Sequence, residues 1–406
     1  MKILCVFGRY NYGDPARGEG YEYVNFLPEF RSLGHEVVFF ESFSRNAYRD
    51  FADLNRQFLE TVQAETPDVI LCVLLGYEIW LETLELIRSG SNAILINWST
   101  DDSWKYEQFS RFIAPAFHIY ATTYPETLVK SRQEGHANFV LTQWAANSAN
   151  LKEPLPAARC RYQVSFIGSA YGNRPKYISA LEQIGINVEC FGFGWKNGPI
   201  SSADIPKIMR SSIISLNFGD SGMVMRGIVP GRSRQTKARI FEVPGAGGFL
   251  MTEYAAGLDS AYRIGEEIAV FDGVADLAEK IRYFSNHPDE RDRIAMAGYL
   301  RTREEHTYEM RFSRLLDAAA QRKRMFPDRR HKVDFEKYSA IEKKHRAGLW
   351  LILFRQVLLL PCVTIWGKEK GVRIARRLLF ELGWRLVGRK VYFVTGWPGR
   401  LFYKES

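Results

Sequence analysis

Short apolar runs alternate with amphipathic stretches through the first 150 residues. Between the runs, Gly20–Leu33 and Asp50–Glu65 carry apolar positions at the three-to-four spacing of helices. Strands separated by helices predict a parallel sheet that is covered on both faces. The runs that we expect to be its strands are Ile3–Phe7, Glu36–Phe40, Val69–Leu75, Ala93–Asn97, Phe117–Ala121 and Phe139–Leu141.

The same alternation begins again after Asn147–Arg159, a stretch with two prolines that we interpret as a linker. Two consecutive Rossmann-like halves, at residues 1–150 and 160–320, follow from this pattern, although other paired doubly wound folds would also fit it. The elements expected in the second half are the strands Val164–Ile167, Val188–Phe191, Ile213–Phe218, Phe249–Met251 and Ile268–Phe271 and the helices Pro175–Ile184 and Asp204–Ser211.

The distribution of charge separates residues 321–406 from the rest of the chain. It is 46% apolar, as globular proteins are, and its net charge is +9. Residues 321–406 hold 21 Lys and Arg against 7 Asp and Glu, whereas the remaining residues hold 34 against 39. The body is therefore mildly acidic, and the basic tail is expected to meet an anionic partner. Five scattered cysteines without a CxxC pair indicate reduced thiols in a cytosolic body.

The tail combines an apolar run with an amphipathic one. Arg355 and Pro361 interrupt the run Gly348–Trp366 and leave it short of the ~20 residues of a transmembrane helix. Gly371–Lys390 places basic residues on one helical face and leucines on another, as in helices that lie in an anionic membrane interface. We therefore expect residues 321–406 to hold the protein peripherally on the inner face of the cell membrane.

Three alternatives for the tail remain: a helical extension packed on the body, a transmembrane helix, and nucleic-acid binding. Apolar residues dominate between the charges, which disfavours nucleic acid. Because both halves are complete by about residue 320, removal of the tail near Arg330 should leave a soluble body.

The strongest chemical signal is RIFEVPGAGGFLMTEY, residues 239–254. Lys237, Arg239 and Glu242 are expected on a helix that leads into a turn with Gly247 and Gly248. The cations suit a phosphate, the carboxylate suits a ribose diol, and the glycines allow close approach of the backbone to a ligand. The segment favours a phosphorylated, hydroxyl-bearing ligand.

Other loops of the second half lie where open α/β sheets bind ligands, at the carboxyl ends of the predicted strands. Their backbone amides, aromatic rings and cations would suit a nucleoside diphosphate, whereas plain turns and a solvated basic loop are the alternative interpretation. The candidates are Gly168, Ser169, Arg174, Gly194, Trp195, Asn217 and Arg232, with Arg226 and Arg234 in the same basic loop.

Two loops of the first half are candidates for acceptor-side chemistry. Gly13 lies in the glycine-rich loop after the first strand, which is not a GxGxxG fingerprint but could admit a sugar phosphate or an acceptor. Asp101 and Asp102 follow the fourth strand, where either could be the general base toward an acceptor hydroxyl. The alternatives are an ordinary connection and a helix N-cap.

The segment RIFEVPGAGGFLMTEY and the helices after it resemble the C-terminal half of group 1 GT-B glycosyltransferases, most closely the CgeB-like (spore-maturation type) branch. This resemblance covers residues 160–320. Residues 1–150 resemble the family more loosely. The resemblance implies two Rossmann-like domains facing a cleft, with Glu242 as the ribose-binding group of the donor. It also implies an acidic pair at Asp101–Asp102. The sequence departs from the superfamily at Arg234, eight positions before Glu242, where a first glutamate is common.

The expected function is sugar transfer from a nucleotide sugar to a glycan or lipid-linked acceptor. No cofactor or metal is expected, because the sequence has no DxD motif in a suitable context and no His or Cys cluster. A P-loop and a GxSxG elbow are absent too, which disfavours NTPases and hydrolases. Two alternatives are a catalytically silent glycan-binding or assembly protein, motivated by Arg234, and a sugar-nucleotide epimerase, which shares the GT-B fold.

Overall fold

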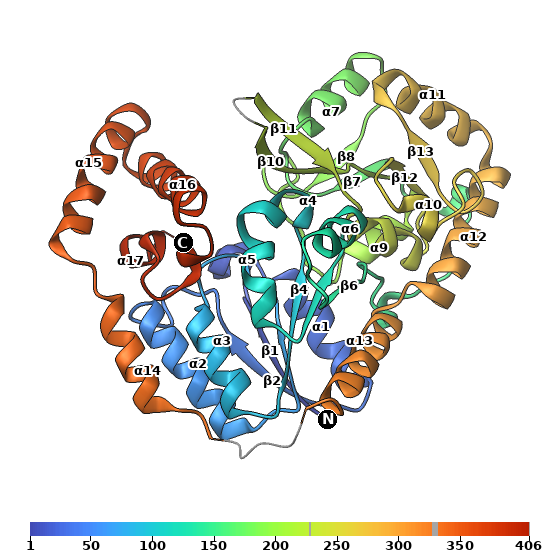
Figure 1. Cartoon of the computed structure of the whole chain (residues 1–406). Helices are drawn as coiled ribbons and strands as arrows, with labels where there is room; N and C mark the ends of the chain where they lie inside the picture. Colours follow the sequence, from blue (N-terminus) through green and yellow to red (C-terminus); the bar gives the residue numbers. More distant parts are fainter. Residues whose placement is uncertain (227–228, 327–331, 406) are drawn as a thin grey trace. The chain divides into compact units, whose positions relative to one another are not determined.

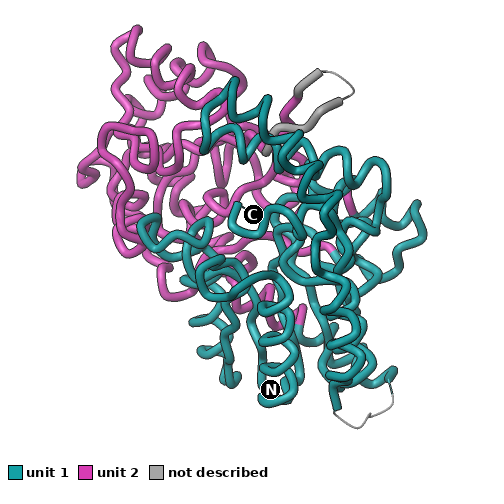
Figure 2. The backbone as a smooth tube through the Cα atoms, turned by 90° about the vertical axis from the view of Figure 1, so that its left-hand side faces the viewer, with its two compact units in different colours: residues 1–122, 128–140, 316–406 teal, residues 123–127, 141–315 magenta. Residues whose placement is uncertain are grey.

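The computed structural model (Figure 1) describes residues 1–226, 229–326 and 332–405, without the side chains of residues 222–226, 229 and 230. The chain forms two compact units, coloured separately in Figure 2. Unit 1 comprises residues 1–122, 128–140 and 316–406, and unit 2 comprises residues 123–127 and 141–315.

Unit 1 contains the predicted six-stranded sheet, in the order β2-β1-β3-β4-β5-β6. The pairs from β2 to β5 are parallel, as predicted. The central strands are buried along their whole length, because helices cover a parallel sheet on both faces. Its elements are β1 (Lys2–Phe7), α1 (Tyr21–Ser32), β2 (Glu36–Glu41), α2 (Phe51–Glu65), β3 (Val69–Cys72), α3 (Leu81–Gly90), β4 (Ile94–Ser99), α4 (Asp102–Lys105), α5 (Arg111–Ile113), β5 (Ile119–Thr122), α6 (Pro125–Gln133) and β6 (Phe139–Leu141).

Unit 2 contains a five-stranded sheet in the order β13-β12-β9-β7-β8, and its neighbouring strands are parallel. The predicted strands are all present, each within two residues of its expected ends. The elements are β7 (Tyr162–Ile167), α7 (Arg174–Gln183), β8 (Glu189–Phe191), α8 (Ile205–Arg210), β9 (Ser212–Asn217), α9 (Arg239–Gly245), β12 (Leu250–Glu253), α10 (Leu258–Ala261), β13 (Ala269–Phe271), α11 (Gly273–Asn286), α12 (Pro288–Glu305) and α13 (Tyr308–Lys323).

The basic loop expected after Asn217 is a β-hairpin instead. Strand β10 (Asp220–Arg226) pairs antiparallel with β11 (Val229–Arg234), and the hydroxyls of Ser221 and Ser233 lie 3.0 Å apart across it. Glycines and a proline hide the alternation of a strand in this sequence, so the pattern indicated a loop. The side chain of Arg226 lies outside the described residues.

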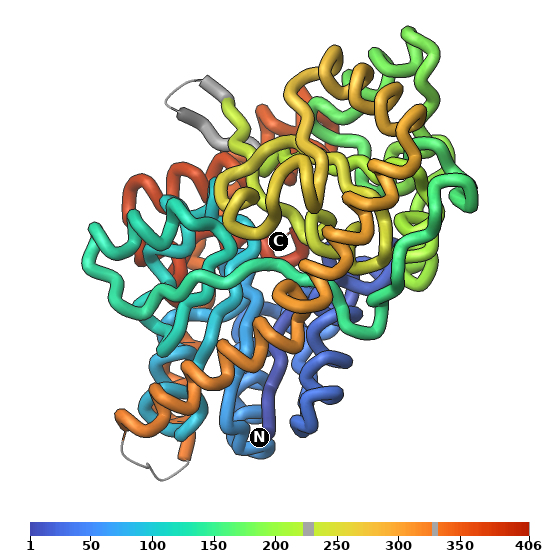
Figure 3. Tube along the Cα trace, turned by 90° about the vertical axis from the view of Figure 1, so that its right-hand side faces the viewer, coloured from blue at the N-terminus to red at the C-terminus, as the bar shows by residue number. Residues whose placement is uncertain are grey.

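The chain leaves unit 2 through α13, whose last residues belong to unit 1 (Figure 3). The expected separate tail domain, residues 321–406, is part of unit 1, and residues 141–150, assigned to the first domain, belong to unit 2. The tail helices are α14 (Phe335–Glu342), α15 (Leu349–Trp366), α16 (Lys368–Val387) and α17 (Trp397–Leu401).

Two parts of the tail complete the core of unit 1. The hydroxyl of Tyr338 donates to the carbonyl of Ala52 at 2.6 Å, and the hydroxyl of Tyr77 donates to the carbonyl of Val394 at 3.0 Å. Tyr338 and Val394 are at most 1% exposed. The tail therefore provides buried side chains that residues 1–140 lack, which explains why it folds with them.

Candidate functional site

The predicted residues of unit 2 lie at the carboxyl end of one parallel sheet. Gly168 and Ser169 follow β7, Gly194 and Trp195 follow β8, and Asn217 ends β9. Arg239 and Glu242 stand in the first turn of α9, and Lys237 lies two residues before it. The fold therefore brings these loops to one edge, as the sequence predicted.

Arg174 holds the first βα loop in place. It is only 7% exposed, and its guanidinium donates to the carbonyl of Ser169 at 2.9 Å and to the hydroxyl of Tyr171 at 3.1 Å. The guanidinium also lies 4.0 Å from the centre of the Tyr171 ring, and burial lowers its pKa. These contacts fix the loop between β7 and α7. The amides of Gly168 and Ala170 in this loop donate to the carbonyls of Phe191 and Phe193, both at 2.8 Å.

Trp195 makes a similar contact from the neighbouring strand. Its indole nitrogen donates to the carbonyl of Gly168 at 2.7 Å, and Gly192 approaches the same carbonyl with φ of 129°. Only glycine fits at Gly192, because a Cβ there would meet the backbone of Gly168. The loops after β7 and β8 thus support one another, and Gly194 (φ 86°) lies in the exposed part of this pair.

A buried carboxylate that the sequence analysis missed, Glu253, lies at the end of β12. Its side chain is 5% exposed, accepts from the amide of Gly219 at 2.8 Å and pairs with Arg234 at 3.2 Å. Arg234 lies 3.9 Å from Asp272 as well. A carboxylate directly after a predicted strand was the signal that could have found Glu253.

Arg239 and Glu242 form an ion pair one helical turn apart, with side chains 24% and 17% exposed. Arg232, an exposed residue of β11, donates to the carbonyl of Ser221 at 2.8 Å. Asp220 caps α7 by accepting from the amide of Asn173 at 3.2 Å. The edge therefore presents cations and carboxylates that are already fixed by contacts within unit 2.

Gly247 and Gly248 serve chain packing. A Cβ at Gly247 (φ 81°) would overlap the carbonyl of Lys152, and one at Gly248 would lie 2.6 Å from the carbonyl of Met209. The close approach expected of these glycines is thus toward protein backbone. Asn217 is 2% exposed and donates to the hydroxyl of Thr252 at 2.8 Å, which ties β9 to β12.

The two aspartates of unit 1 differ sharply in their surroundings. Asp102 is 2% exposed and accepts hydrogen bonds from the hydroxyls of Ser99, at 2.6 Å, and Ser110. Burial raises the pKa of Asp102 despite these hydroxyls. Asp101, just before α4, is only half-buried, so it is the more accessible of the two predicted bases.

Glu22, in the first turn of α1, lies in the field of Asp101. Burial, and to a smaller extent the charge of Asp101, raise the pKa of Glu22 to about 7. Gly13 lies in the preceding loop with φ of 69°, where a Cβ would lie 2.9 Å from the carbonyl of Phe43. The sequence offered no signal for Glu22 beyond its place after the glycine-rich loop.

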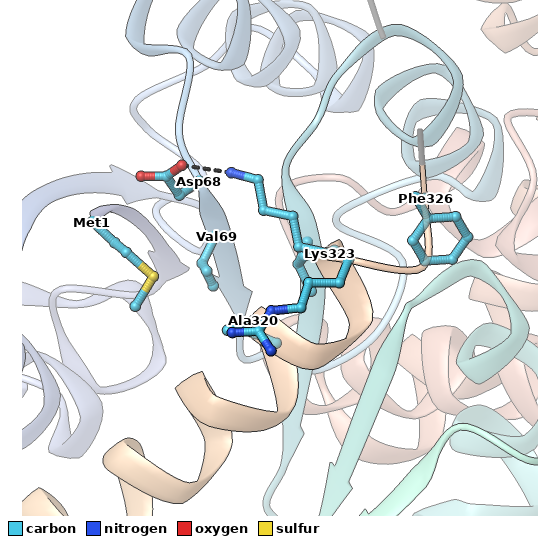
Figure 4. Close-up of a pocket in the computed structure, with 9 residues that line it drawn as sticks. Met1, Asp68, Val69, Ala320, Lys323 and Phe326 are labelled. Atoms are coloured by element: carbon cyan, nitrogen blue, oxygen red, sulfur yellow. Dashed lines mark hydrogen bonds and ion pairs between the residues drawn. The ribbon is translucent and has the colours of Figure 1, made fainter. Parts of the chain in front are cut away.

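A cavity of about 410 Å³ lies elsewhere on unit 1 (Figure 4). Val69 and Ile94 line it from the first residues of β3 and β4, so it opens at the amino ends of these strands. Lys323 crosses it to pair with Asp68 at 2.7 Å. Open α/β sheets bind ligands at the opposite, carboxyl end. Among the described residues, no group of three or more His, Cys, Asp or Glu side chains is arranged to hold a metal ion.

Comparison with known proteins identifies the architecture. Residues 174–317 match the model of a family described as glycosyl transferase-like, and no curated protein sequence matches the chain. Sucrose-phosphate synthase from Thermosynechococcus elongatus is similar in structure, with a TM-score of 0.56 and 11% identity over 79% of this chain and 99% of that one.

Two further structures are similar at comparable levels. HepE of Anabaena, in complex with UDP and glucose, has a TM-score of 0.54 and 13% identity, over 79% of this chain and 100% of its own. The lipopolysaccharide outer core galactosyltransferase WaaB has a TM-score of 0.51 and 11% identity, over 79% of this chain and 99% of its own. The chain has the two-domain GT-B fold, and its second unit contains a region that matches the glycosyl transferase-like family.

Proposed function

We propose that the protein transfers a sugar from a nucleotide-sugar donor to a glycan or lipid-linked acceptor. The observation that carries this proposal is the carboxyl edge of unit 2, where α9 presents Arg239 and Glu242 inside the matched region 174–317. The same edge carries the β7–α7 loop, beside which we place the diphosphate.

Glu242 would accept both hydrogens of the donor ribose diol. Its ion pair with Arg239 orients the carboxylate, so a diol would meet a fixed acceptor. Arg232, Lys237 and Arg234 would lie near the diphosphate and stabilise the charge that develops as it leaves. Because these cations would supply the stabilisation, we propose that the reaction is metal-independent.

On the acceptor side, Asp101 is the base that we favour. It would take the proton of the acceptor hydroxyl while that oxygen bonds to the anomeric carbon of the sugar. The bond from this carbon to the phosphate oxygen breaks, and the nucleoside diphosphate leaves with the electron pair.

UDP-glucose is the first donor to test, because HepE was solved with UDP and with UDP-glucose. The CgeB-like branch, a lipid-linked acceptor and a place on the inner face of the cell membrane complete the proposal. A lipid-linked acceptor would be met at a membrane surface, to which the basic tail is suited.

Calorimetric titration with UDP-, GDP- and ADP-sugars and a CMP-sugar tests donor binding directly. Glu242→Gln should weaken binding of the best donor by about 1.5–3 kcal/mol, because charge-assisted hydrogen bonds to the ribose are lost. The control is Glu304→Gln, which changes a side chain that is 64% exposed on α12. Equal affinity of both variants would refute the assignment of Glu242. Hydrolysis of the donor without an acceptor would separate a working transferase from a silent binding protein.

A further inference from the structure

Helix α15 carries an apolar surface that no described part of the chain covers. Among the described residues, it is the one helix long and apolar enough to cross a membrane, and only 11% of it is buried. Two tryptophans lie near its ends. The large apolar side chains exposed on it by 40–84% are Leu349, Trp350, Ile352, Leu353, Phe354, Val357, Leu360, Ile365 and Trp366.

The charge that interrupts this helix in the sequence faces the protein. Arg355 donates to the carbonyl of Leu401 at 3.0 Å and pairs with Glu405 at 3.2 Å. Its guanidinium also lies 5.0 Å from the centre of the Phe402 ring. The outer face of α15 therefore bears no charged side chain over its 18 residues. Arg355 therefore does not oppose contact of this outer face with lipid.

Helix α16 holds α15 in place. The two helices pack along each other after a turn at Gly367, and Leu359 and Cys362 of α15 share a buried cluster with Ala375 and Leu379 of α16. Gly371 permits this approach, because a Cβ there would lie 2.5 Å from the carbonyl of Cys362. Part of the interfacial helix expected at Gly371–Lys390 thus packs against α15. Of the two helices, α15 presents the larger exposed apolar face.

Cations surround this face. Lys343, Lys344 and Arg346 precede α15 and are exposed, and Lys368, Lys370 and Arg373 follow it and are exposed. Apolar side chains with basic residues at both ends are the pattern of helices that lie in an anionic lipid interface. A soluble protein seldom leaves such an apolar patch open to water.

We propose that the α15–α16 hairpin is a monotopic anchor, in which α15 lies flat in the interface of an anionic membrane. A spanning α15 is excluded by its partner, because α16 carries eight charged residues in 20 and could not follow it across the bilayer. Separation of the two helices would expose the cluster around Leu359 and Ala375. The anchor rests on the tail alone, so its failure would leave the proposed donor chemistry untouched.

The experiment compares two variants of the full chain by flotation with vesicles of 70% phosphatidylcholine and 30% phosphatidylglycerol. The first combines Trp350→Glu, Val357→Glu and Leu360→Glu on the outer face of α15, where the side chains are 72–84% exposed. The control carries the same charge change at exposed apolar positions outside the tail: Val129→Glu, Leu141→Glu and Ile264→Glu. The α15 variant should bind vesicles about 100-fold more weakly than the control.

A second set of variants tests whether binding requires an anionic lipid. Lys368→Gln and Lys370→Gln should each lower vesicle binding about fivefold at low salt, and pure phosphatidylcholine should abolish the difference. Donor titration of the same variants should match the parent protein, which shows that they are folded. Equal vesicle binding by the α15 variant and its control would overturn the proposal.

Light scattering without lipid tests whether the apolar face of α15 instead binds a second copy of the chain. A dimer that the α15 variant converts to a monomer would overturn the proposal in favour of self-association. An impermeant maleimide added outside sealed vesicles should label the thiol of Lys370→Cys completely. Labelling of the parent protein under the same conditions gives the background. Protection of this position would show a spanning helix and would also overturn it.

Discussion

At the scale of single residues, buried charged groups are matched to specific partners. Arg291 is completely buried, and its guanidinium donates to the carbonyls of Leu155, Ser212 and Ile213 at 2.8–2.9 Å. Such pairing is required because an unpaired charge in an apolar interior costs several kcal/mol. The same logic separates the two candidate bases, Asp101 and Asp102.

Asp102→Ala should destabilise unit 1 by about 1–3 kcal/mol, because the hydroxyls of Ser99 and Ser110 lose their shared acceptor. Asp101→Asn should instead lower turnover by about 10²–10⁴-fold with donor affinity unchanged, if Asp101 is the base. Chemical unfolding and steady-state kinetics of both variants test this division. Near-normal turnover of Asp101→Asn would show that Asp101 is not the base.

His306 should make unit 2 sensitive to acid. It is 6% exposed, and its ring contacts the carbonyl of Ala261 and the guanidinium of Arg311, both at 2.8 Å. Burial, and then the charges of Arg311 and Arg301, lower its pKa from 6.5 to about 4. Below pH 6.5 the unfolded chain binds the proton and the native protein does not, so stability falls as the pH falls from 6.5 toward 4, by about 3 kcal/mol in all.

Urea unfolding at pH 7 and pH 5 measures this effect. The parent protein should lose more stability between the two values than His306→Gln, which has no imidazole to titrate. Identical losses would assign the acid sensitivity to other groups.

At the scale of elements, glycines in the left-handed region fix the connection between α9 and β12. Gly247→Ala should destabilise the protein more than Gly265→Ala, although both glycines have φ near 80°. A Cβ at Gly247 overlaps the Lys152 carbonyl, whereas nothing lies within 4 Å of one at Gly265. Both variants carry the cost of positive φ, about 1 kcal/mol, and the overlap should add about 1–3 kcal/mol for Gly247 alone. Equal unfolding midpoints would contradict the close approach.

The β10–β11 hairpin is an element for which the sequence pattern and the structure disagree. Helices and strands of the two sheets follow from local periodicity, because a buried strand must be apolar throughout and a surface helix apolar on one stripe. The hairpin, which lies outside both sheets, carries no such stripe, and Ser221 and Ser233 hold it together instead.

At the scale of the whole molecule, we expect the tail to be required for unit 1 to fold. Removal of residues 332–406 would expose Tyr77 and Trp80, which are now at most 6% exposed, and would leave Glu82 without the amide of Val394 that it accepts at 3.0 Å. We therefore expect the truncated protein to aggregate or to unfold at a markedly lower temperature. The expected soluble body would appear only if unit 1 repacked.

Thermal unfolding of the truncated and full-length proteins checks this expectation, with Tyr392→Ala as a smaller change. Tyr392 is 1% exposed in the core, so its removal should cost about 3–5 kcal/mol. A soluble truncated protein with an unchanged midpoint would show that the tail is dispensable.

The sequence by itself determined the strands of the two parallel sheets, the two Rossmann-like halves and the loops at the carboxyl edge, because these depend on periodicity and chain order. Candidates such as Glu242 and Asp101 followed from chemistry at those loops, and their roles stay predictions. Only the tertiary structure decided which polar side chains already have hydrogen-bond partners within the protein. Arg174, Asn217 and Asp102 contact neighbours brought together by packing, and no local pattern encodes such partners.

The tail shows the same division. Its charge and apolar runs were legible in the sequence, but whether Arg355 faces solvent or the protein depends on the carbonyl of Leu401, 46 residues away. Burial of Tyr338 and Val394 likewise depends on surfaces formed by distant residues. Long-range packing joins such segments, so the tertiary structure alone made the tail part of unit 1 and left α15 as its exposed apolar face.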